Sequence, residues 1–139
     1  MTTTIVRNDQ IKSALVARLK ANATVLAQLK DTSEIREAQW QADNFSYPNI
    51  RVRVIESLPT AANCNFSTIK VSIGVFSEEA SSQEADRIAG IISNELHTQS
   101  FTSATIHFSG LLVEKLIGAI RVDDRTWMSE VILSGTANG

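Results

Sequence analysis

The stretch that decides the fold runs from Ser67 to His97, with the sequence STIKVSIGVFSEEASSQEADRIAGIISNELH. Up to Phe76, apolar side chains alternate with small or polar ones, the period-two pattern typical of a half-buried strand. A polar break follows, and apolar residues then recur at helical spacing. Ser81 and Glu84 predict a capping box at the start of this helix. The sequence therefore predicts a strand and a helix that pack together through their apolar faces.

The composition indicates one globular domain over residues 1–139, with 1–7 and 135–139 as flexible ends. Of the 139 residues, 43% are hydrophobic and 20% are charged, and the net charge is −2. These values argue against a membrane or disordered protein, and against a general attraction for nucleic acid. Cys64 is the single cysteine, so no internal disulfide can form. Because the first residues also lack the apolar core of a signal peptide, we expect a cytoplasmic product.

Upstream of the central stretch, the pattern predicts two helices. Apolar residues that recur every four positions between Ile11 and Leu19 predict a helix capped by Asn8 or Asp9. The pattern shifts near Asn22, which leaves either a continued helix or a short second helix with Asn22 as its cap, and the break is favoured.

The residues between these helices and the central strand predict less regular structure. Ile35–Gln41 leaves two alternatives open, a short strand or an irregular crossing segment. After a turn, Ile50–Glu56 is predicted as a strand with Arg51 and Arg53 on its outer face. Small polar residues and a proline make Ser57–Asn65 a predicted loop.

Downstream of the central helix, the sequence predicts more sheet. Phe101–Phe108 alternates as a strand does, and Gly110–Ser134 is predicted to form a long hairpin that turns at Val122–Arg125. The order of elements predicts an α+β fold, a mostly antiparallel sheet of four to five strands with helices packed on one face.

The first arm of this hairpin is apolar on both faces, which a small domain with two or three helices can hardly cover. The side chains can form local core packing or a subunit interface, and the sequence leaves both open. The candidate interface residues are Leu111, Leu112, Val113, Leu116, Ile117 and Ile120.

Motifs with a chemical role are missing from the sequence. His97 and His107 have no cysteine or carboxylate at metal-ligand spacing, and the glycines form no phosphate-binding loop. The acidic pairs Glu78–Glu79 and Asp123–Asp124 are typical of solvated turns, although such pairs can also hold a cation or a catalytic water. We therefore predict no catalytic, metal-binding or cofactor-binding residue, and no enzyme.

Arg51 and Arg53 carry the one basic pattern of interest. Two arginines on one strand face can contact a phosphate backbone or an acidic protein surface. The alternative is a solvated outer face, which is favoured because no aromatic side chains for base stacking are interleaved with them.

The layout of the chain resembles the tail terminator, or tail completion, proteins of long-tailed bacteriophages. The resemblance rests on the helix Ile11–Lys20, the short helix Val25–Leu29, the Tyr47–Pro48 entry into a strand, the strand and helix of Val71–Leu96, and the hairpin turn at Asp123–Thr126. It implies a structural virion protein of the tail or neck, assembled in the host cytoplasm and without catalytic residues.

The resemblance also implies partners. The subunits would form a ring, usually of six, that caps the tail tube, stops the addition of tube protein and provides the docking surface for the head connector. DNA would pass through the lumen without specific binding, facing acidic residues such as Glu78 and Glu79, and no membrane is involved. Expected contacts to the tube or connector come from the loops Ser57–Asn65 and Val122–Arg125, and from Arg51, Arg53, Asp123, Asp124 and Arg125. The alternatives are another neck component, such as a head-closure or adaptor subunit, and a small nucleic-acid-binding module.

Overall fold

One six-stranded sheet forms the framework of the protein, in a computed structural model that describes residues 5–29, 34–37, 47–59 and 66–139. Its elements are α1 (Asn8–Lys20), α2 (Ala23–Leu26), β1 (Ile35–Glu37), β2 (Asn49–Pro59), β3 (Phe66–Ser77), α3 (Gln83–Leu96), β4 (Phe101–Ser103), β5 (Ile106–Arg121) and β6 (Trp127–Asn138). The strand order is β1-β2-β3-β6-β5-β4, in which only β1 and β2 pair in parallel. The predicted α+β class is confirmed.

The strand count of four to five was too low. Phe101–Phe108 is not one strand, because Ala104 and Thr105 adopt positive φ angles and form a tight turn between β4 and β5. Ile35–Glu37 forms a short strand, while 38–41 lie outside the described residues.

The strand–helix unit at the centre agrees with its prediction. Ile69, Val71, Ile73 and Val75 of β3 are all at most 1% exposed, and the apolar stripe of α3 is buried as well. The predicted capping box of Ser81 and Glu84 does not form, because the N-cap residue is Ser82 and, among the described residues, the Ser81 hydroxyl accepts only the Gln83 amide, at 3.4 Å. The Glu84 carboxylate instead accepts a hydrogen bond from the Ser77 hydroxyl at 2.7 Å, which ties the start of the helix to the end of the strand.

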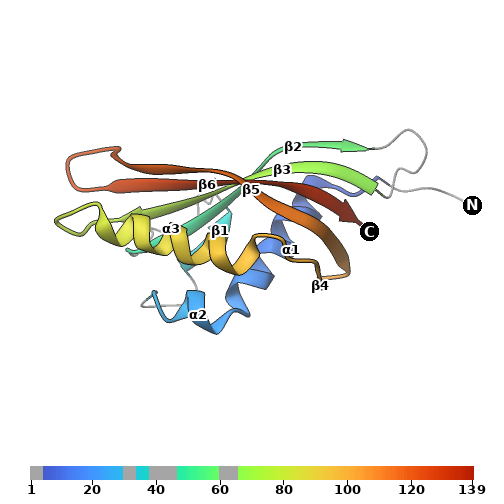
Figure 1. Ribbon diagram of the computed structural model, residues 1–139, viewed down its shortest axis with the longest axis horizontal. Helices are drawn as coiled ribbons and strands as arrows, with labels where there is room; N and C mark the ends of the chain where they lie inside the picture. Colours follow the sequence, from blue (N-terminus) through green and yellow to red (C-terminus); the bar gives the residue numbers. More distant parts are fainter. Residues whose placement is uncertain (1–4, 30–33, 38–46, 60–65) are drawn as a thin grey trace, which may run out of the picture.

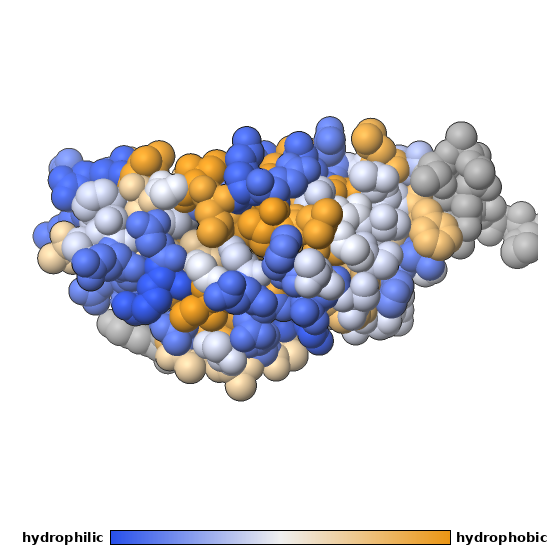
Figure 2. Space-filling model, in the orientation of Figure 1, coloured by the Kyte–Doolittle hydropathy of each residue, from blue (hydrophilic) through white to orange (hydrophobic). Residues whose placement is uncertain are grey.

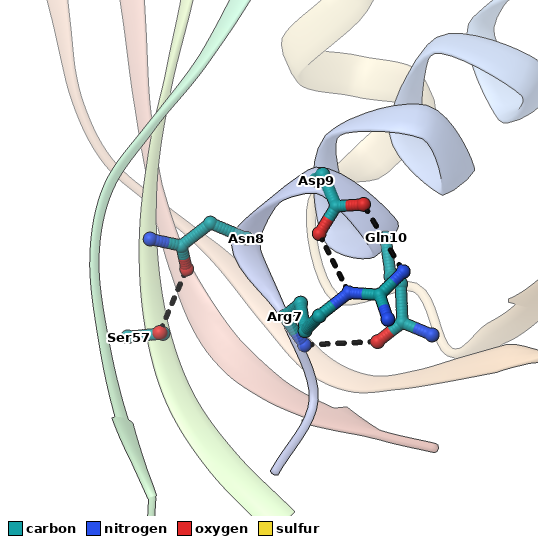
Figure 3. Close-up of polar contacts among 5 residues, drawn as sticks. All are labelled: Arg7, Asn8, Asp9, Gln10 and Ser57. Carbon is teal, nitrogen blue, oxygen red and sulfur yellow. Dashed lines mark hydrogen bonds and ion pairs between the residues drawn. The ribbon is translucent and has the colours of Figure 1, made fainter.

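Helix α1 begins directly after Arg7, one residue earlier than the predicted caps allow (Figure 3). The Arg7 guanidinium lies 3.0 Å from the Asp9 carboxylate, and this hydrogen-bonded pair holds the pKa of Asp9 below its ordinary value. The Ser57 hydroxyl of β2 donates to the Asn8 side-chain oxygen at 2.8 Å and fixes the helix start to the sheet. The predicted break at Asn22 is confirmed, since its Oδ1 accepts the Val25 amide.

The strands reach further than the sequence predicts. Residues 135–138, expected in a flexible end, continue β6 and pair with both β3 and β5. Ser57–Pro59, expected in a loop, belongs to β2, while 60–65 lie outside the described residues. Residues 136–138 pair on both sides and Ser57–Pro59 pair with β3 alone, and side-chain patterns reveal neither pairing.

All the helices lie on one face of the sheet, and Figure 1 shows the other face without a helix along the described chain. Helix α1 packs mainly on β1 and β2, and α3 on β3, β5 and β6. The tip of the β5–β6 hairpin lies at the same end as the start of α3, and the C-terminus lies at the other end (Figure 1).

Candidate subunit interface

The outer edge of β5 is the main candidate for an interface. Strand β4 pairs only with Ile106–Phe108, so from Ser109 onward no described strand lies beside the outer side of β5. Three register shifts interrupt its pairing with β6. An unpaired edge of this length exposes main-chain donors and acceptors, which proteins either protect or use for association.

Part of this edge is protected from within the chain. The Leu111 carbonyl accepts the Thr98 amide at 2.7 Å, the Val113 amide donates to His97 Nδ1 at 3.0 Å, and the Ala119 amide donates to Asp86 Oδ1 at 2.9 Å. Within the described residues, the main chain of Glu114–Gly118 makes no such bond on its outer side. This short window is the part of the edge that remains open.

Sequence reasoning missed the two side chains that protect the edge. Asp86 lies outside the apolar stripe of α3. Besides the Ala119 amide, its carboxylate accepts the Ser129 hydroxyl at 2.6 Å. His97 was considered only as a metal ligand. Both act on strand residues far along the chain, so no local pattern could have revealed them.

Most of the predicted interface side chains are exposed beside this window. Leu112, Leu116, Ile117 and Ile120 have exposed fractions of 48%, 54%, 37% and 54%. Figure 2 shows hydrophobic surface gathered along the hairpin above α3. Leu111 is an exception, because it is 1% exposed and belongs to the core, and Val113 is half-buried against the core. The contiguous patch thus has four members.

The exposed side chains occupy both faces of the edge. Leu112, Ile117 and Ile120 pair in register with Ser134, Glu130 and Met128, which alternate with the core residues of β6 and so lie on the face without helices. Leu116 pairs with the buried Val131 and lies on the helix side. The prediction of a hairpin arm that is apolar on both faces is confirmed.

The hairpin turn and the start of α3 form an acidic end of the molecule. Glu78, Glu79, Asp124 and Arg125 line one depression together with Trp127. In the turn, Asp123 Oδ1 accepts the amides of Arg125 and Thr126, both at 2.9 Å, and these bonds lower the pKa of Asp123. The structure therefore brings the two predicted acidic pairs together, although no cluster within the described residues has the ligands to hold a metal ion.

The two arginines of β2 have different surroundings. Arg53 is exposed, as predicted. Arg51 stacks on the Phe76 ring at 3.9 Å and donates from Nε to Asn49 Oδ1 at 3.1 Å. Burial lowers the pKa of Arg51, and this effect outweighs the Tyr47 side chain, which raises the pKa. Arg51 is thus half-buried rather than part of a solvated basic face.

Comparison with known proteins gives a family and a fold. The family model described as Tail completion protein gp17 matches residues 13–127. No curated protein matches the chain. A chain from the solved structure "Virion of native gene transfer agent (GTA) particle" superposes with a TM-score of 0.73 and 15% sequence identity, over 93% of this chain and 95% of that one. Among the described residues, no helix combines the length and apolar composition needed to cross a bilayer.

Proposed function

The chain belongs to the tail completion protein gp17 family, and from this premise we propose that it is a tail terminator, a structural protein that closes the end of a phage tail. The family match confirms the resemblance noted in the sequence. In the proposed function, identical subunits form a ring, with six as the expected number. The ring caps the tail tube, stops further addition of tube protein and offers the docking surface for the head connector.

The observation that carries this proposal is the outer edge of β5. It combines an open main-chain window at Glu114–Gly118 with four exposed apolar side chains. A contiguous apolar patch on a small soluble domain is a common mark of a protein–protein interface. Ring subunits need such a surface for their lateral contacts.

The acidic end of the molecule supports a second kind of contact. In the proposed ring, the turn at Val122–Arg125 touches the tube or the connector, and Glu78 and Glu79 face the lumen. Carboxylates repel the phosphate backbone, so DNA would pass without specific binding. Arg53 remains available for contact with tube or connector, whereas Arg51 acts within the subunit.

Light scattering over a concentration series tests the ring. We expect the mass of about six subunits for the wild type and a monomer for Leu112→Asp, because a carboxylate in an apolar contact is strongly unfavourable. Ala17→Asp, on the exposed side of α1, is the matched control and should leave the ring intact. An unchanged oligomer in Leu112→Asp would remove the hairpin from the interface, and a protein monomeric at every concentration would contradict the free ring.

A further inference from the structure

A second exposed apolar patch lies at the opposite edge of the sheet. Within the described residues, β1 pairs with β2 only at Ile50–Val52, and no other described strand lies beside the outer side of β2 from Arg53 to Pro59. Here Ile55 and Leu58 are 37% and 57% exposed, and Phe66 at the start of β3 is 37% exposed. The lateral contact of the proposed ring has so far used the β5 edge alone.

The two patches cannot meet within one chain. Strands β3 and β6 separate β2 from β5, which places the two edges about 14 Å apart at about 4.8 Å per strand. A contact between them must therefore join different copies. Because the two surfaces are different, such a contact is head-to-tail, and repetition produces a ring when the rotation closes.

Strand directions allow the two edges to pair. Each of the steps β2–β3, β3–β6 and β6–β5 is antiparallel, so β2 and β5 run in opposite directions. A second copy in the same orientation would thus place its β2 antiparallel to β5. The open window Glu114–Gly118 can then bond to the main chain of Arg53–Glu56.

The side chains on the helix-free face fit this pairing. Along β5 the order is Leu112, Lys115, Ile117, and along β2 in the opposite direction it is Leu58, Glu56, Arg53. In this register Leu112 meets Leu58 and Lys115 meets Glu56. All the charged members are exposed, and none makes an ion pair within the described part of the chain.

We propose that the β5 edge of one copy docks on the β2 edge of the next copy, with Leu112 against Leu58 and Lys115 against Glu56. This inference rests on the ring in the proposed function and names the second surface of its lateral contact. The apolar pair excludes water, while the charged pair fixes the register.

Charge reversal with rescue tests the register. Lys115→Glu and Glu56→Lys should each raise the concentration for half-assembly about tenfold, because like charges then face each other. The double variant should restore assembly to near the wild-type value. Lys20→Glu, on the exposed side of α1, is the control and should have no effect. Single variants that assemble like the wild type, or a double variant without rescue, would overturn the pairing.

A cysteine pair provides an independent readout. In a Cys64→Ser background, Leu112→Cys with Leu58→Cys should give a ladder of disulfide-linked oligomers after mild oxidation. Each single-cysteine protein should stay uncrosslinked. If Leu112→Asp dissociates the ring but no ladder forms and charge reversal has no effect, this pairing fails while the ring stands. A wild type that is monomeric at every concentration contradicts both.

Discussion

Strands β3 and β5 have similar apolar residues but different positions in the sheet. The inward side chains of β3, in the middle of the sheet, are at most 1% exposed. On β5, which is at the edge beyond Phe108, the four patch residues are 37–54% exposed. The difference comes from neighbours and not from composition, since β3 has a strand on each side and helices above it. An apolar strand thus forms core at the centre of this sheet and a contact surface at its edge.

A matched truncation in each strand is the strongest test of this difference between β3 and β5. Ile73→Ala should destabilise the monomer by about 2–5 kcal/mol, because it leaves a cavity in a fully buried site. Leu116→Ala should stay within about 0.5 kcal/mol. Urea unfolding at a concentration below that of assembly measures both. Equal losses for the two variants would show that Leu116 is packed in the monomer.

A second prediction concerns the point at which β5 leaves the covered part of the sheet. A Cβ atom at Gly135 would lie 2.8 Å from Leu111 Cδ2 and 3.2 Å from Leu111 Cα. Gly135→Ala should therefore cost about 1–3 kcal/mol through overpacking. Gly118→Ala is the control, since a Cβ atom there meets nothing within 4 Å. A neutral Gly135→Ala would mean that the two strands can separate at this point without loss.

Asp86 of α3 accepts hydrogen bonds from both strands of the β5–β6 hairpin, so its removal tests the edge region by itself. Asp86→Ala leaves the Ala119 amide and the Ser129 hydroxyl without their acceptor and should cost about 1 kcal/mol. In Asp86→Ala, amide hydrogen exchange at Ala119 should become faster than in the wild type, while exchange in β3 should change less. Asp86→Asn keeps a side-chain oxygen, so its exchange rate at Ala119 should lie between those of the wild type and Asp86→Ala. Unchanged exchange at Ala119 in Asp86→Ala would contradict the proposed protection of the edge.

The smallest effect is expected at the hairpin turn. Because the amides of Arg125 and Thr126 lower the pKa of Asp123, the ionised carboxylate favours the folded turn. This stabilisation is complete above the unfolded pKa of about 3.9 and is lost as the pH falls through the lower folded value. The stability advantage of the wild type over Asp123→Ala should therefore shrink between about pH 5 and pH 2. An advantage independent of pH would exclude the charge as its cause.

The sequence predicts local and alternating features of this fold well. The strand and helix of Ser67–His97, the break at Asn22 and the two-sided apolar hairpin arm all follow from short-range periodicity. The predicted ends of two strands were wrong because they depend on backbone pairing with residues far along the chain. This pairing extends β6 to Asn138 and β2 to Pro59. Leu111 belongs to the core because it lies on the helix side of β5, where the residues after α3 bond to it, whereas its neighbour Leu112 lies on the helix-free face.

The short open window on β5 has a consequence for how subunits associate. The window Glu114–Gly118 is short, so a single contact between two copies gains few hydrogen bonds and is weak on its own. In a closed ring, every subunit makes two such contacts, and the last one forms at the high effective concentration of an intramolecular step. Assembly should then be nearly all-or-none, with partial arcs too sparse to detect between the monomer and the finished ring.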